Sequence, residues 1–165
     1  MIKQGLKIAS WGENINVKIP VTNTKGIFTG EVIKELSGSG VKLNVTAVMT
    51  LDQVKKIIEH LNSATSGIIS VFAGRIADTG IDPIDIMKKS LEIMKVNNNL
   101  ELIWASPREL LNVFQAQDIG CHIITATNDI INKIEFVGKD LNEFSLETVK
   151  MFHKDSNSAG FIIKT

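Results

Sequence analysis

A lysine lies in the middle of an otherwise apolar segment near the start of the 165-residue chain. In the segment INVKIPVTN, residues 15–23, β-branched residues alternate with Asn16, Lys18 and Pro20. This alternation predicts a strand whose successive side chains point to opposite faces, so Lys18 points away from the apolar face. Its amine either extends into water from an edge strand, as Pro20 allows, or lies where an amine can do chemistry.

The chain has only two arginines among its 18 basic residues, Arg75 and Arg108. The planar guanidinium of arginine binds phosphate or carboxylate through paired hydrogen bonds. Each arginine comes about three residues after a predicted strand, the place where ligands of α/β proteins bind. For each arginine taken singly, a surface ion pair with Asp78 or Glu109 explains it as well as an anion site does.

The rest of the chain alternates between strand-like and helical patterns. Apolar runs predict strands, and apolar residues at helical spacing predict helices between them. Thr50 with Gln53 predicts a capping box, and Pro83 and Pro107 suit first-turn positions. The expected strands are 15–21, 42–48, 67–72, 101–105 and 121–126, and the expected helices are 26–37, 51–64, 83–96, 107–117 and a C-terminal one at 144–155.

Strands separated by helices pair in parallel through right-handed crossovers, which predicts an α/β fold. An open, doubly wound sheet and a β/α barrel both satisfy this pattern. In such sheets both faces are usually apolar, but each of the first four strands has a polar face here. The residues on those faces are Asn16 and Lys18, Asn44 and Thr46, Ser70 and Phe72, and Trp104 and Ser106. We therefore expect the lysine and both arginines at one functional edge of the sheet.

Composition narrows the class of protein. The length suits one domain, 1–165, and a formal net charge of zero gives no reason to expect a nucleic-acid or anionic-membrane partner. No apolar run reaches the length of a membrane span, and the start is not typical of a signal peptide. The single cysteine, Cys121, excludes an internal disulfide and suits a reducing cytoplasm. The three histidines lack metal-ligand spacing, so no metal site is expected.

Five segments together resemble the second half of the transaldolase family, which includes fructose-6-phosphate aldolase. They are NVKIPVT, LNVTAVMT, ISVFAGRIADTG, WASPREL and GCHIITAT, in this order. The resemblance covers nearly the whole chain. It implies a single module, 1–165, made of strands four to eight of a TIM-barrel type fold.

The resemblance also implies roles for residues on the polar faces. Lys18 matches the Schiff-base lysine of a class I aldolase, which must attack a ketose carbonyl as a neutral amine. Asn44 and Thr46 match active-site strand positions, where the threonine helps to hold the catalytic water. Ser70 and Phe72 match positions that line the substrate pocket. Fructose-6-phosphate aldolases carry tyrosine where Phe72 lies, which favours transaldolase.

By the same resemblance, Arg75, Ser106 and Arg108 receive the phosphate of the sugar. The implied activity is transfer of a dihydroxyacetone unit between sugar phosphates, as in the pentose phosphate pathway, with no metal or organic cofactor. A homo-oligomer is expected. The rival hypothesis is a non-catalytic sugar-phosphate-binding or assembly module, which would need both arginines but not Lys18.

The resemblance does not extend to the first three strands of the family barrel. In the family these strands carry an aspartate, an asparagine and a further acid or amide of the site. Residues 1–14 are interpreted as the end of the helix before the lysine strand and supply none of these groups. Three explanations stay open: a fragment or mis-started version of a longer enzyme, which we favour, a second chain that completes the barrel, or a remnant that binds phosphate without turnover.

Overall fold

A computed structural model describes residues 1–160 and 162–163 of the chain. They divide into two compact units, Met1–Ile131 and Asn132–Thr165, and each is described by itself. The expectation that the whole chain forms one module stays a prediction.

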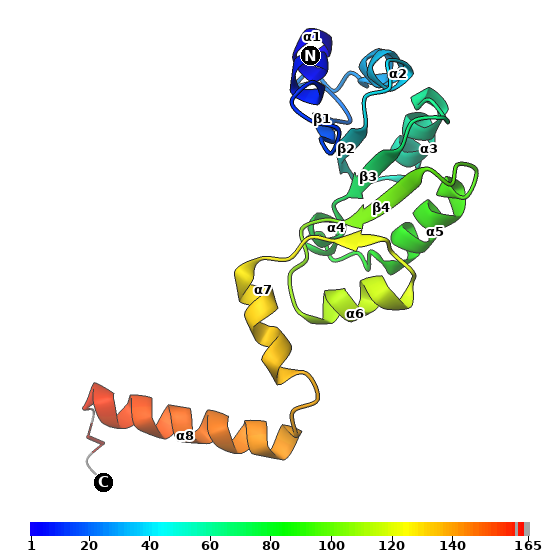
Figure 1. The fold of residues 1–165 in the computed structure, drawn as a ribbon. Coiled ribbons are helices and arrows are strands. Elements are labelled where there is room, and N and C mark those ends of the chain that lie inside the picture. Colours follow the sequence, from blue (N-terminus) through cyan, green and yellow to red (C-terminus); the bar gives the residue numbers. More distant parts are fainter. Residues whose placement is uncertain (161, 164–165) are drawn as a thin grey trace. The chain divides into compact units, whose positions relative to one another are not determined.

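The first unit is built on a sheet of five parallel strands whose spatial order equals their order in the sequence (Figure 1). A doubly wound sheet would reverse its order at a switch point, and this sheet does not. Sequential parallel strands with intervening helices are the arrangement of a TIM barrel, so the fold is α/β and consistent with part of such a barrel. The strands are β1 (Val17–Pro20), β2 (Leu43–Val48), β3 (Gly67–Val71), β4 (Leu100–Trp104) and β5 (Ile123–Ile124).

Helices follow each strand of the first unit. Thr50 and Gln53 form the predicted capping box, in which each side chain bonds the backbone N–H of the other residue. The short helix α4 comes directly after β3 and was not predicted. The helices are α1 (Ile2–Ala9), α2 (Gly30–Gly38), α3 (Leu51–His60), α4 (Ala73–Ala77), α5 (Ile84–Met94), α6 (Leu111–Asp118) and α7 (Asn128–Asn132).

The hydrophobic core lies between one face of the sheet and the helices. Alternate residues of the strands point to this face, and helices α2, α3 and α5 run along it (Figure 1). Within the first unit, residues 1–131, no such layer of helices covers the opposite face, and the polar side chains of β1–β3 lie on it. The strand residues in the core include Val17, Ile19, Leu43, Val45, Ile69, Val71, Leu102 and Trp104.

Two helices begin later than the sequence predicts. The helix expected from residue 26 begins at Gly30, because the Asn23 side chain accepts hydrogen bonds from the backbone N–H groups of Lys25 and Ile27 and holds a turn there. The helix expected from residue 107 begins at Leu111. There the side chain of Asn112 accepts from the backbone of residues 108 and 109 and keeps them outside the helix.

The last strand is shorter than the predicted 121–126. The imidazole of His122 accepts a hydrogen bond from the backbone N–H of Leu102, 3.0 Å away, so a side chain takes the place of a ladder contact. Cys121 is half-buried, with its sulfur 3.3 Å from the carbonyl oxygen of Leu102. Burial raises the pKa of this thiol, as suits a packing residue rather than a nucleophile.

The second unit contains a short 3₁₀ helix, Lys133–Phe136, and the long helix α8 (Leu141–Ala159). The predicted helix at 144–155 is therefore confirmed, with longer bounds. Asp140 caps it by accepting from the N–H groups of Asn142 and Glu143. In the part of the chain that the structure describes, no helix has the length and apolar character needed to cross a membrane.

Candidate functional site

Lys18 and Asn44 lie side by side on the open face of the sheet. They are register partners in the β1–β2 ladder, and Pro20 and Thr46 are the next pair on the same face. Adjacent strands lie about 4.8 Å apart, so the register places the backbone of Lys18 next to that of Asn44. Lys18 is exposed and Asn44 is half-buried.

Ser70 joins this group from the neighbouring strand β3. Its hydroxyl donates a hydrogen bond of 2.7 Å to Oδ1 of Asn44, and the serine is only 2% exposed. With Oδ1 accepting, the NH₂ group of Asn44 is the part of the amide left to face a ligand. An amine, an amide donor and a hydroxyl from three adjacent strands are suited to bind a hydroxylated carbonyl compound.

Thr46 lies two residues beyond Asn44, at an irregular place in β2. The ladder to β3 shifts its register between Val45 and Val48, and Ala47 has a positive φ of 62°. The hydroxyl of Thr46 is buried and has no hydrogen-bond partner among the described residues. Such groups usually bind water or a ligand, so this hydroxyl is available at the site.

The prediction that Trp104 shares the polar face is wrong. Trp104 is fully buried on the helix-covered face, in line with Leu102 and paired with Val71. Ser70 pairs instead with Ile103, which therefore lies on the open face. β4 ends at Trp104, so the alternation does not carry on to Ser106, which lies in a turn with a φ of 58°.

The loop after β4 is locked against α4 by close backbone contact. The N–H of Gly74 donates to the carbonyl oxygen of Ala105 at 3.2 Å. A Cβ on Gly74 would lie 1.5 Å from the carbonyl oxygen of Ser106, so only glycine fits. This contact holds Ser106 in its left-handed conformation beside α4.

Arg108 is bound on this loop by Asp78, the residue that ends α4. Its Nε donates to Oδ1 at 2.8 Å and its Nη2 donates to Oδ2, which makes a bidentate ion pair. The Arg108 guanidinium, chiefly through this hydrogen bonding, holds the pKa of the Asp78 carboxyl below its usual value, and Arg75 contributes a smaller Coulombic effect. The sequence left open whether Arg108 forms a surface ion pair or an anion site. The structure shows the ion pair, with Asp78.

Arg75 is on the exposed side of α4. No hydrogen bond or ion pair of its side chain is found within residues 1–160 and 162–163. It lines a largely apolar cavity of about 420 Å³ together with Met49, Thr50 and residues of α4 and the α5 region. Phe72, half-buried, is the residue just before α4.

The structure thus brings the predicted residues together in two groups. Lys18, Asn44, Thr46 and Ser70 form one on the open face, and the second lies around α4 and the loop after β4, with Arg75, Ser106 and Arg108. Sequence reasoning gave Asp78 no role beyond a possible ion pair and missed the loop contact of Gly74. The segment FAGRIAD carries both residues and was the available signal.

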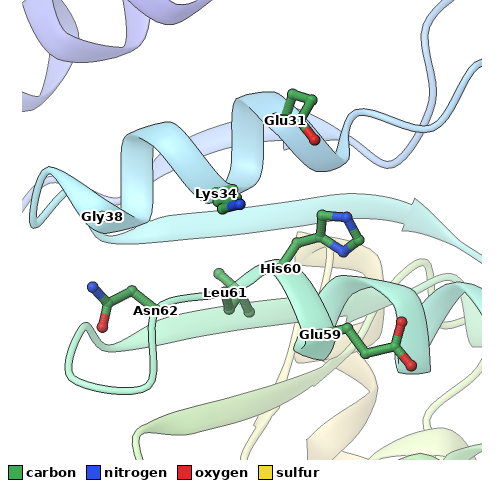
Figure 2. Close-up of a pocket in the computed structure, with 7 residues that line it drawn as sticks. All are labelled: Glu31, Lys34, Gly38, Glu59, His60, Leu61 and Asn62. Atoms are coloured by element: carbon green, nitrogen blue, oxygen red, sulfur yellow. The ribbon is translucent and has the colours of Figure 1, made fainter.

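A separate groove of about 460 Å³ lies between α2 and α3. Figure 2 shows its lining residues, which come from the two helices and from the segment after α3 and include Lys34, Glu59 and His60. None of the predicted site residues lines it. It belongs to the helical layer and not to the polar face of the sheet.

Comparison with known proteins identifies the family of the chain. The model of the transaldolase/fructose-6-phosphate aldolase family matches residues 1–163. A probable transaldolase of Clostridium acetobutylicum is 32% identical over 137 residues, covering 81% of this chain and 59% of the relative. A probable transaldolase of Streptococcus equi subsp. zooepidemicus is 33% identical over 135 residues with the same coverage.

The chain therefore spans 59% of the length of these curated relatives. The family match covers nearly all of it, and the sequential order of the parallel strands is consistent with the match. The chain belongs to the transaldolase/fructose-6-phosphate aldolase family.

Proposed function

We propose that this chain carries the lysine-bearing part of a class I aldolase that transfers a dihydroxyacetone unit between sugar phosphates, as transaldolase does in the cytoplasmic pentose phosphate pathway. The observation that carries the proposal is the register pairing of Lys18 with Asn44, whose amide is fixed by Ser70. Schiff-base formation needs a neutral amine at the carbonyl carbon, and an oriented amide on the neighbouring strand can donate a hydrogen bond to the substrate.

In the proposed reaction the neutral amine of Lys18 attacks the ketose carbonyl, and loss of water gives an iminium. The carbon–carbon bond beyond the adjacent carbon then breaks, and its electron pair moves toward the iminium nitrogen to give an enamine. The departing fragment leaves as an aldose phosphate once its hydroxyl has lost a proton. The enamine attacks the aldehyde of the acceptor, and water releases the product and restores the amine.

Asn44 and Thr46 act on the oxygen atoms of this reaction. The free NH₂ of Asn44 donates to a hydroxyl or carbonyl oxygen of the substrate, and the unpartnered hydroxyl of Thr46 holds the water that hydrolyses the iminium. Ser70 and Phe72 line the pocket. Arg75, Ser106 and Arg108 hold the phosphate, which fixes the reacting carbons against Lys18.

Further β/α units complete this site in the proposed active form, on the same polypeptide or on another. Val17 and Val21 donate their backbone N–H groups to the carbonyl oxygens of Lys42 and Thr46, so the N–H and C=O of Lys18 point to the other edge of β1, with which no described strand pairs. A parallel strand added at this edge would cover Lys18, which is exposed in the described residues, and could supply the acid and base that the proton transfers need.

The exposure of Lys18 favours a second candidate, a module that binds sugar phosphates without reacting. It would use Arg75, Ser106 and Arg108 alone. The two candidates differ in one respect that can be measured, namely covalent capture of a ketose.

The test is an intact mass after incubation of the protein with fructose 6-phosphate and borohydride, which reduces an iminium to a stable amine. The proposal expects one adduct on the wild type and none on Lys18→Ala, with Lys42→Ala as the matched control because Lys42 bonds only a backbone carbonyl nearby. Equal adduct on the wild type and on Lys18→Ala would refute the catalytic proposal and leave the binding module.

A further inference from the structure

Arg108 is held at both ends by its own chain. Its backbone N–H donates to Oδ1 of Asn112 at 2.7 Å, and its guanidinium donates two hydrogen bonds to Asp78. Asp78 is itself fixed, because its N–H donates to the carbonyl oxygen of Gly74 at 3.0 Å at the end of α4. Thirty positions separate Asp78 from Arg108 in the sequence, so this is a tertiary link between α4 and the loop after β4.

The geometry leaves Arg108 able to bind an anion while it is paired. Of its five N–H donors, two are used by the carboxylate, and the remaining three, on Nη1 and Nη2, make no hydrogen bond to any residue that the structure describes. Arg75 adds a second positive charge near Asp78, close enough to lower the pKa of its carboxyl by a Coulombic effect. Half of each side chain of the pair is exposed, which leaves a phosphate access to the free donors.

We propose that Asp78 is a positioning residue for phosphate: its carboxylate holds the Arg108 guanidinium in the orientation in which the free N–H groups receive the phosphate of the substrate. This inference rests on the proposed function. It assigns a role to a residue that is not among those predicted to bind the phosphate. A long arginine side chain loses rotamer freedom when it binds a ligand, and Asp78 imposes that restriction before the ligand arrives.

Asp78 has a second conceivable role, competition with phosphate for Arg108, and the two roles have opposite consequences for binding. If Asp78 competed with phosphate for Arg108, removing its charge would strengthen phosphate binding. If it positions Arg108, removing its charge weakens binding, although one negative charge near the two arginines is gone. The sign of the change therefore separates the two roles.

The experiment is a calorimetric titration of the full chain with inorganic phosphate and with fructose 6-phosphate. It uses the Lys18→Ala background so that no covalent adduct forms. We expect Asp78→Asn to raise the Kd about tenfold, and Asp78→Glu to recover part of the loss. Glu109→Gln is the matched control. It removes the same charge beside Arg108 from a carboxylate that accepts no hydrogen bond from a described residue, and its Kd is expected to stay within about twofold.

An unchanged or lower Kd in Asp78→Asn, with a native circular dichroism spectrum, would overturn the positioning role and leave the phosphate site intact. Equal weakening by Glu109→Gln would also overturn it, since charge alone would then explain the effect. Absence of saturable phosphate binding by the parent protein would overturn the phosphate site and this inference with it. The borohydride adduct at Lys18 is a separate measurement, so failure of catalysis and failure of phosphate positioning are distinguishable.

Discussion

The two groups of site residues are positioned by different means. On the open face of the sheet, backbone register places Lys18 beside Asn44, and a single side-chain hydrogen bond from Ser70 is added. Around α4, no ladder joins the loop after β4 to the helix. There a glycine contact and a bidentate ion pair do the positioning.

This difference has a physical consequence. Strand register is maintained by several backbone hydrogen bonds, so one substitution on the open face changes a side chain and leaves the framework in place. The loop depends on a few contacts that one substitution can remove. We therefore expect changes near α4 to disturb geometry and those on the open face to disturb chemistry.

Gly74→Ala is expected to have the largest effect on stability. The new Cβ would lie 1.5 Å from the carbonyl oxygen of Ser106, so the loop or α4 must move, at a cost of about 3 kcal/mol in the free energy of unfolding. Urea denaturation followed by circular dichroism measures it. Gly38→Ala is the matched control, because a Cβ there meets nothing within 4 Å, and it should change stability by less than about 1 kcal/mol.

A loss of less than about 1 kcal/mol in Gly74→Ala would show that the loop adapts freely. The tight contact would then not be what holds Ser106 and Arg108 in place.

Ser70→Ala tests the positioning of side chains on the open face. It should lower the free energy of unfolding by less than Gly74→Ala does. It removes the donor to Oδ1 of Asn44 in a buried place, at about 1–2 kcal/mol of unfolding free energy, and frees the amide to rotate. The same denaturation experiment applies. Ser90→Ala serves as control, since Ser90 is equally buried but bonds only the carbonyl of Ile86 in its own helix, and its cost is expected to be smaller.

If Ser70→Ala leaves the rate of adduct formation at Lys18 unchanged, the orientation of Asn44 does not matter to the chemistry. A slower rate with the native fold retained would sharpen the distinction between the two groups.

The sheet and the first group could be predicted from the sequence because both follow from alternation. A period of two puts Lys18 on the face opposite Val17, and parallel pairing then brings it beside Asn44. The rule places Trp104 in line with Leu102, on the helix-covered face, and the prediction of a polar face there was wrong because it extended the alternation to Ser106, beyond the end of the strand, where the backbone has a positive φ. Alternation predicts nothing beyond the last residue of a strand.

The second group could be predicted only in part. Both arginines follow strands, which marks the functional edge, but the choice between ion pair and anion site for Arg108 needed its distance to Asp78. That contact spans thirty positions and arises from α4, a helix of five residues too short to leave a periodic signal.

The smallest expected effect is on the pKa of the Asp78 carboxyl, which is paired with Arg108. Because Arg108 lowers the pKa of Asp78 in the folded state, the pair contributes stability at pH values above the ordinary carboxyl pKa of 3.8, and that contribution is lost as the pH falls through the lowered value. Carboxyl NMR titration of the native protein should give a midpoint below 3.8, and Arg108→Gln should return it toward 3.8. A midpoint at the ordinary value in the wild type would mean that the pair does not persist in solution.

The most direct test of the account is the location of the borohydride adduct. After incubation with fructose 6-phosphate and reduction, the protein is digested and the modified peptide identified by mass spectrometry. The account predicts that the adduct lies on Lys18 and on none of the other lysines, since Lys18 is the one paired with Asn44. Adducts spread over several lysines, or none on the peptide that contains Lys18, would contradict it.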